Sequence, residues 1–94
     1  MIKKPLTIKA FQDLIREAYF ERDKKRGLFG TWLWLQEEMG ELAKAIRKND
    51  KKNIEEEIAD VIAWTVSVAN LLNIDVEDAL IKKYGEPPKK HFDE

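Results

Sequence analysis

The 94-residue sequence contains no cysteine and only one histidine, His91. The absence of cysteine excludes a disulfide framework and thiol catalysis, and it fits a reducing compartment. The N-terminal residues lack the apolar core of a signal peptide. The longest apolar run, residues 61–74, is too short and too often interrupted by polar residues to span a bilayer. We therefore expect a cytoplasmic protein with no membrane partner.

The chain also lacks an excess of charge of either sign, because 17 lysines and arginines balance 18 aspartates and glutamates to a net charge of −1. No general basic field attracts nucleic acid, so we expect no nucleic-acid partner. The phosphate-binding loops GxxxxGK[ST] and GxGxxG are missing as well, which excludes enzymes that hold phosphates on a glycine-rich loop. A phosphate group would have to be held by metal ions and basic side chains.

Apolar residues recur at helical spacing, and neither sustained alternation nor an Asn-Gly or Asp-Gly hairpin dipeptide indicates a strand. The pattern predicts an all-α protein with helices at about residues 7–26, 31–48, 53–73 and 75–84. Residues 27–30 and 49–53 are expected to be short connectors. We therefore expect a single domain over residues 1–94 with a four-helix bundle-like architecture. So small a domain buries a limited fraction of its surface, which favours self-association.

Several helix ends carry recognisable signals. Thr7 and Asp75 are expected N-caps, and Gly27 is an expected C-terminal stop. Asn53 and Glu56 have the spacing of a capping box, which would place Glu56 and the glutamate before it in the first turn of the third helix. Acids in that turn would offset the helix dipole without any further role.

Two neighbouring predicted helices carry the same acidic pattern. The segment LQEEMGELAKAI, residues 35–46, aligns with IEEEIADVIAWT, residues 54–65. Because a helix turns by about 100° per residue, Glu38 falls within the apolar stripe of its helix and Glu57 within that of the next. The other acids of the pattern lie at the edges of these stripes or outside them: Glu41, Asp60, Glu37 and Glu56.

An ionised carboxylate on a core-facing stripe needs a partner, because burying an unpaired charge costs free energy. One interpretation is that Glu38 and Glu57 pair with basic residues of the first or fourth helix. The other is that two antiparallel helices hold a cation between four carboxylates: Glu38, Glu41, Glu57 and Asp60. The in-phase pattern favours the cation. Ligands that are all oxygen suit Mg²⁺, with Mn²⁺ as a substitute, whereas zinc or a di-iron centre would be expected to recruit histidine or cysteine.

These motifs, EExxE at residues 37–41 followed by ExxD at residues 57–60, resemble the signature of MazG-type nucleotide pyrophosphohydrolases of the all-α NTP pyrophosphatase superfamily. The similarity extends from about Trp32 to Tyr84. It implies Mg²⁺-dependent cleavage of the α–β phosphate bond of a nucleoside triphosphate, which gives a nucleoside monophosphate and pyrophosphate. It also implies a homodimer or a dimer of dimers. Carried over by position, the metal ligands would be Glu38, Glu41, Glu57 and Asp60.

The resemblance further gives Glu37 the role of an additional ligand or of the base that orients water, beside Glu38 in the catalytic centre. Four other side chains are candidates for contact with the substrate: Trp34, Asn70, Lys82 and Lys83. Trp34 would stack on a base, although a large aromatic residue more often belongs to a core or an interface. Similar enzymes have a nucleotide-binding asparagine near Asn70 and basic residues near the two lysines. A hydrogen bond between helices explains Asn70 equally well, and the helix dipole explains the lysines.

Two alternatives fit the same residues. Within the superfamily, phosphoribosyl-ATP pyrophosphohydrolases and enzymes of the dUTPase or dCTPase type have a comparable acidic cage, so the preferred base and sugar are not specified. In a different class, a non-enzymatic helical oligomerisation module would use the acids in salt bridges. We expect the enzyme, acting on nucleoside triphosphates in nucleotide pool sanitation.

Overall fold

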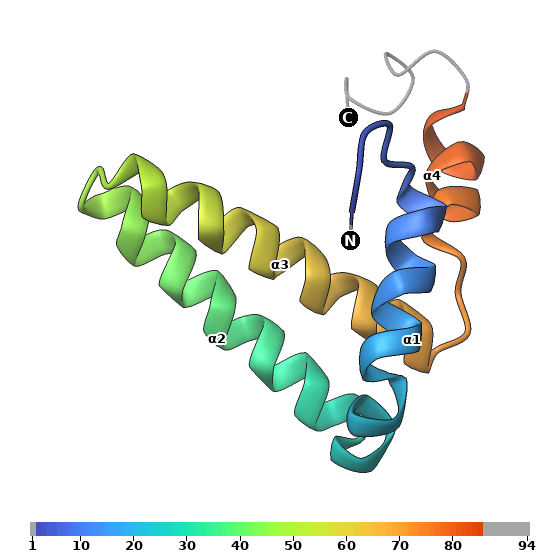
Figure 1. The fold of residues 1–94 in the computed structure, drawn as a ribbon. Coiled ribbons are helices and arrows are strands. Elements are labelled where there is room, and N and C mark those ends of the chain that lie inside the picture. Colours follow the sequence, from blue (N-terminus) through green and yellow to red (C-terminus); the bar gives the residue numbers. More distant parts are fainter. Residues whose placement is uncertain (1, 86–94) are drawn as a thin grey trace.

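The computed structural model describes residues 2–85, and His91 lies outside them. The described residues form four helices and no strand: α1 (Ile8–Arg26), α2 (Leu28–Arg47), α3 (Lys51–Leu71) and α4 (Val76–Tyr84) (Figure 1). The prediction of an all-α protein is confirmed.

The N-caps of α1 and α4 are those expected from the sequence. The Thr7 hydroxyl accepts a hydrogen bond from the backbone N–H of Ala10 at 3.0 Å. The Asp75 carboxylate accepts one from the backbone N–H of Asp78 at 2.9 Å. Each side chain thereby satisfies a backbone donor that has no partner within its helix.

The prediction of a capping box at Asn53 was wrong, because α3 begins at Lys51 and is capped by Asp50. The Asp50 carboxylate accepts a hydrogen bond from the backbone N–H of Asn53 at 3.3 Å. No acid lies in the first turn of α3, so Glu55 and Glu56 do not offset the helix dipole from that turn.

The connector expected over residues 27–30 was also wrong, since α2 begins at Leu28 and only Gly27 separates it from α1. Gly27 has φ +89° and ψ 164°, a backbone conformation that only glycine adopts without strain. Its carbonyl accepts a hydrogen bond at 2.9 Å from the hydroxyl of Thr31, which is fully buried. A single residue therefore makes the sharp turn between the two helices, and a buried side chain holds it.

Helices α2 and α3 form a long antiparallel hairpin, which α1 crosses near its open end (Figure 1). Helix α4 lies beside the N-terminal half of α1, and the turn around Asn49 projects away from both (Figure 1). Within one chain the helices are thus arranged more openly than in a four-helix bundle. The hairpin brings the two acidic motifs together, and α1 covers the face of α3 next to them.

The buried apolar core is small and consists of Ile15, Leu35, Ala45, Val66 and Ala69. Polar groups add to it where α1 meets the end of α3. The side-chain amide of Gln12 donates to the Asn70 side chain at 2.9 Å and to the Ile74 carbonyl at 2.8 Å. Its oxygen accepts from the backbone N–H of Val76 at 2.8 Å. One side chain therefore joins α1 to α3 and to the start of α4.

Much of the hairpin's apolar surface is uncovered. Several large side chains of α2 and α3 are about half exposed: Leu33, Met39, Ile46, Ile58 and Ile62. Solvent-exposed side chains of this size reduce the hydrophobic stabilisation of an isolated chain.

No single helix of residues 2–85 is long and apolar enough to cross a membrane. Helices α3 and α4 pass that test only as a pair, and the chain bends by 100° between them.

Candidate metal centre and adjoining cavity

Three carboxylates converge between the two long helices. Glu38 of α2 and Glu57 and Asp60 of α3 each offer an oxygen atom, and the three oxygens lie within 4.8 Å of one another. Glu38 and Glu57 are half-buried, whereas Asp60 is exposed. Three oxygens at this spacing form a group that could hold a metal ion.

The electrostatics of this group centre on Glu57. Its pKa is raised from 4.5 to about 7, first because the carboxyl group is partly desolvated between the helices. The hydrogen bond and negative charge of Glu38 raise it further, as do those of Asp60. The clustered negative charge disfavours ionisation of Glu57, and a bound cation would reverse that effect.

The other two acids of the EExxE motif lie apart from the group. Glu37 and Glu41 are both exposed on α2, and neither belongs to the three-carboxylate cluster. Glu41 is one turn beyond Glu38 on the same helix, so it is on the same side of α2. Of the four ligands expected from the sequence, the described chain brings together three.

Aromatic rings lie next to the acids. Trp34 of α2 stacks on Trp64 of α3, with ring centroids 5.8 Å apart and an interplanar angle of 10°. The guanidinium of Arg26 lies over the Trp64 ring, 5.0 Å from its centroid. These contacts join the end of α1 to the hairpin close to Asp60.

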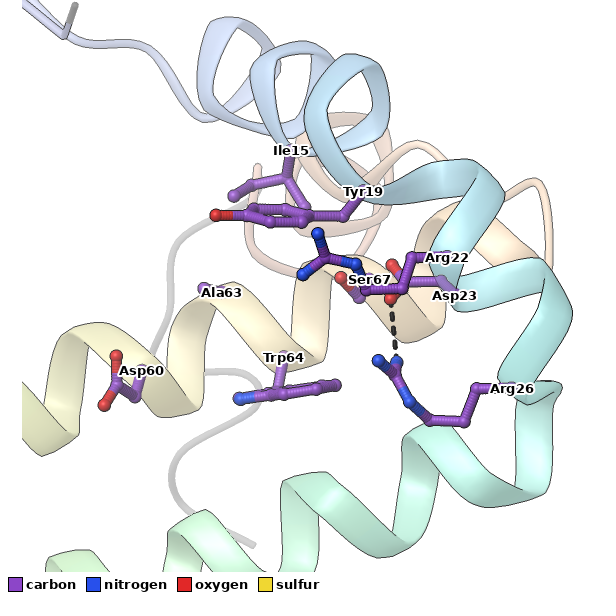
Figure 2. Close-up of a pocket in the computed structure, with 9 residues that line it drawn as sticks. All are labelled: Ile15, Tyr19, Arg22, Asp23, Arg26, Asp60, Ala63, Trp64 and Ser67. Atoms are coloured by element: carbon purple, nitrogen blue, oxygen red, sulfur yellow. Dashed lines mark hydrogen bonds and ion pairs between the residues drawn. The ribbon is translucent and has the colours of Figure 1, made fainter.

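A cavity of about 290 Å³ opens between α1 and α3 beside the acids. It is lined by Ile15, Tyr19, Arg22, Asp23, Arg26, Asp60, Ala63, Trp64 and Ser67 (Figure 2). Asp60 therefore belongs both to the carboxylate cluster and to the wall of the cavity.

The family model of the MazG nucleotide pyrophosphohydrolase domain matches residues 30–92, which is more than half of the chain. The chain belongs to the MazG family. The matched region begins in the first turn of α2 and contains the rest of that helix, α3 and α4, and therefore all three clustered carboxylates. No curated protein was found that matches the chain.

Asp23 and Arg26, which precede the matched region, line the cavity but are not among the site residues expected from the sequence. Asp23 is 3% exposed, and its Oδ1 accepts a hydrogen bond from Nη1 of Arg26 at 2.9 Å. A signal was present, since Asp23 follows Ile15 and Tyr19 at helical spacing on the face that packs on α3. The turn of about 100° per residue that places Glu38 and Glu57 on the apolar stripes of their helices also places Asp23 on this face of α1.

The expected substrate-binding residues lie outside this cavity. Trp34 reaches it only through Trp64. Asn70 lines a second cavity and is bonded to Gln12, as the hydrogen-bond interpretation predicted. Lys82 and Lys83 are exposed on α4, and no residue of α4 lines either of the two described cavities.

Salt bridges do not explain the half-buried Glu38 and Glu57. Among residues 2–85, the ion pairs join Lys9 to Asp13 and Asp75, Lys24 to Glu21, and Arg26 to Asp23. None of them involves Glu38 or Glu57. The interpretation that these two glutamates pair with bases of α1 or α4 is therefore wrong for the described part of the chain.

Proposed function

We propose that this MazG domain is a Mg²⁺-dependent nucleoside triphosphate pyrophosphohydrolase. The observation that carries the proposal is the convergence of Glu38, Glu57 and Asp60 at the edge of a cavity with aromatic walls. The reaction breaks the bond between the α-phosphorus and the oxygen that bridges to the β-phosphate. Water adds to the α-phosphorus, and the products are a nucleoside monophosphate and pyrophosphate.

The donor set fits a hard cation. All three clustered ligands are carboxylates, and magnesium prefers such oxygen ligands, with Mn²⁺ as a substitute. The pKa of Glu57 is raised first by desolvation and then by the neighbouring charges of Glu38 and Asp60, as expected of acids gathered to hold a cation. When bound, Mg²⁺ neutralises charge on phosphate oxygens and makes the attacking water more acidic.

Side chains of this chain would bind the cation and accept the proton of the attacking water. Glu38, Glu57 and Asp60 hold the cation, and Glu41 completes the ligand set from one turn further along α2. Glu37, next to Glu38 and exposed, accepts the proton of the attacking water. Trp34, Asn70, Lys82 and Lys83 remain candidates for contact with the substrate in the complete assembly.

We propose a homodimer or homotetramer acting in the cytoplasm on canonical or non-canonical nucleotides, with a role in pool sanitation. The uncovered apolar side chains of the hairpin support self-association. Phosphoribosyl-ATP, dUTP and dCTP belong in the same substrate panel, because enzymes of the superfamily differ in these substrates.

The test is a panel of nucleotides incubated with Mg²⁺ or Mn²⁺, with pyrophosphate and orthophosphate measured separately. Pyrophosphate should be released, and Glu57→Gln should reduce the rate at least roughly a hundredfold, because a ligand charge is lost from the centre. Glu55→Gln, an exposed neighbour on the same helix, is the matched control and should keep full activity. Orthophosphate as the sole product, or full activity in Glu57→Gln, would contradict the proposal.

A further inference from the structure

The cavity beside the acids contains one buried polar atom without a partner. Asp23 Oδ1 accepts the hydrogen bond from Arg26, but Oδ2 is buried and has no hydrogen-bond partner among the described residues. The side chain is only 4% exposed. Leaving a buried charged acceptor unsatisfied costs free energy, so such atoms in native proteins usually have a function or a missing partner. Asp23 lines the cavity, and a turn of its carboxyl group would present Oδ2 to a ligand there, which can supply the missing donor.

Two aromatic rings and two guanidinium groups belong to the walls of the cavity. The ring of Tyr19 and the indole of Trp64 lie on opposite sides of it (Figure 2). The guanidinium of Arg22 lies 5.4 Å from the centroid of Tyr19, and that of Arg26 lies 5.0 Å from the centroid of Trp64. Aromatic rings and guanidinium planes are the groups on which nucleobases stack. The shape of the walls therefore favours a flat aromatic ligand.

Size and position suit one base and its sugar. The cavity, at about 290 Å³, is at the small end of the range for ligand pockets, roughly 300–1,000 Å³. A whole nucleoside triphosphate would not fit inside it. Asp60 belongs to the wall and to the carboxylate cluster, so a base held against the guanidinium planes that cover Tyr19 and Trp64 would direct its phosphates towards the acids.

The part of the cavity beside Asp23 disfavours an anion. Arg26 already donates to Asp23, and the buried Asp23 carboxylate would repel a phosphate placed beside it. An ionised carboxylate can only accept hydrogen bonds, so the ligand atom facing Oδ2 must carry a hydrogen.

We propose that Asp23 is a specificity-determining residue and that Oδ2 accepts a hydrogen bond from the exocyclic amino group of a nucleobase. This inference rests on the proposed function for the placement of the phosphates. Cytosine and adenine carry an amino group where uracil and hypoxanthine carry a carbonyl oxygen. With a carbonyl at that position, two acceptors face each other, and the ring N–H beside the carbonyl would reach Oδ2 only if the base were displaced in the cavity. The chain therefore prefers nucleotides whose base carries the amino group.

The experiment compares kcat/KM within two matched pairs, dCTP against dUTP and ATP against ITP. In the pair that is hydrolysed better, the amino member should be favoured roughly ten- to a hundredfold, the range for a hydrogen bond to a charged group. Asp23→Asn should reduce this ratio towards one, because the amide can donate to a carbonyl as well as accept. The control is Asp13→Asn on the same helix, an exposed acid that also forms an ion pair, and it should leave the ratio unchanged.

A wild-type ratio near one in both pairs would overturn the inference while leaving pyrophosphohydrolase activity intact. So would a folded Asp23→Asn protein, checked by circular dichroism, that keeps the wild-type ratio. If Asp23→Asn does not fold, the wild-type ratio alone decides.

If no nucleotide is hydrolysed at all, the proposed function fails and the cavity is tested by binding instead. Calorimetry without metal then compares dCMP with dUMP and AMP with IMP. Tighter binding of the amino members, lost in Asp23→Asn, would support the role of Asp23. Equal binding, or no binding of any of the four, would overturn it.

Discussion

Glu57 is the side chain on which the electrostatics of the centre depend. It shares its surroundings with two other acids, and each of these raises its pKa. A group of like charges held together by the fold is destabilising on its own and becomes stabilising when a cation binds. This separates a metal centre from a structural ion-pair network, in which each acid would stabilise the empty protein.

Removing one of the clustered charges should therefore stabilise the metal-free chain. We expect Glu38→Gln to melt at the same temperature as the wild type or higher in a chelator, because repulsion with Glu57 is relieved. Mg²⁺ at a hundredfold excess over its Kd should stabilise the wild type by about 2.7 kcal/mol and the variant far less. Thermal melts with and without Mg²⁺ measure both effects. A variant that melts lower than the wild type in chelator would contradict this account.

The shifted pKa also sets a pH dependence. Because the pKa of folded Glu57 is about 7 and that of the unfolded chain is near 4.5, the folded state binds the extra proton between these values. The stabilisation is fully present below about pH 4.5 and is lost as the pH rises through about 7. The melting temperature of the metal-free protein should fall over this window, and the fall should be smaller in Glu57→Gln. An identical slope in the variant would assign the effect to another group.

At the scale of single residues, the sequence predicted the positions of the clustered acids but not the residues that line the cavity. Glu38, Glu57 and Asp60 could be placed from helical phase, because each position depends on one helix and on one short turn between the two. Asp23 and Trp64 meet only because α1 crosses α3, and no local pattern specifies that crossing. The same limit applies to Asn70, whose partner Gln12 is 58 residues away along the chain.

The most restrictive element in the chain is the joint at Gly27. Its backbone conformation fixes the angle between α1 and α2, and so the position of Asp23 relative to the hairpin. A side chain added there would meet no neighbouring atom, so any cost of substitution comes from the backbone alone.

We expect Gly27→Ala to lower the free energy of unfolding by roughly 1–3 kcal/mol, because alanine is strained at this φ and ψ. Gly40→Ala is the matched control within α2. A Cβ there also meets open space, and alanine favours the helix by up to about 1 kcal/mol, so stability should rise. Denaturant unfolding measures both. A Gly40→Ala protein that is destabilised would show that another backbone approaches this position in the assembly.

All four helices were predicted from the sequence, and the errors concern their bounds. The predicted connector at residues 27–30 assumed that a turn needs several residues, whereas Gly27 alone makes it and Thr31 holds it. The start of α3 was placed at Asn53, because Asn53 and Glu56 have capping-box spacing, whereas Asp50 is the N-cap. Asn and Asp are comparably good N-caps, so the local pattern does not decide between the two positions.

As a whole molecule, the chain presents an open hairpin with a small core. Ile58 and Ile62, one turn apart on α3, are 45% and 52% exposed. The covering of such a face by a second copy would bury apolar area that one chain cannot bury.

We expect the double variant Ile58→Glu/Ile62→Glu to be monomeric and inactive, because two charges would have to be buried at the interface. Sedimentation measures the mass, and pyrophosphate release measures the activity. The control is Ile81→Glu, which places the same charge on an exposed isoleucine of α4, away from the hairpin. A wild-type protein that sediments as a monomer at assay concentration would contradict this prediction.

Self-association was expected from chain length, and the four-helix bundle was expected from short connectors. The second expectation was too compact for one chain, because Gly27 turns α1 across the hairpin instead of alongside it. No residue pattern in a single sequence distinguishes a stripe that packs on its own chain from one that packs on another copy.

The hairpin has a consequence for the order of folding. The carboxylates of Glu38, Glu57 and Asp60 meet when one short turn closes, whereas the contact of Gln12 with Asn70 closes a loop of 58 residues. Contacts close in sequence form first, because less chain entropy is lost. The cation would thus find its ligands before α1 docks, and under the proposed function changes in α1 could alter the choice of base without disturbing the hairpin that would hold the metal.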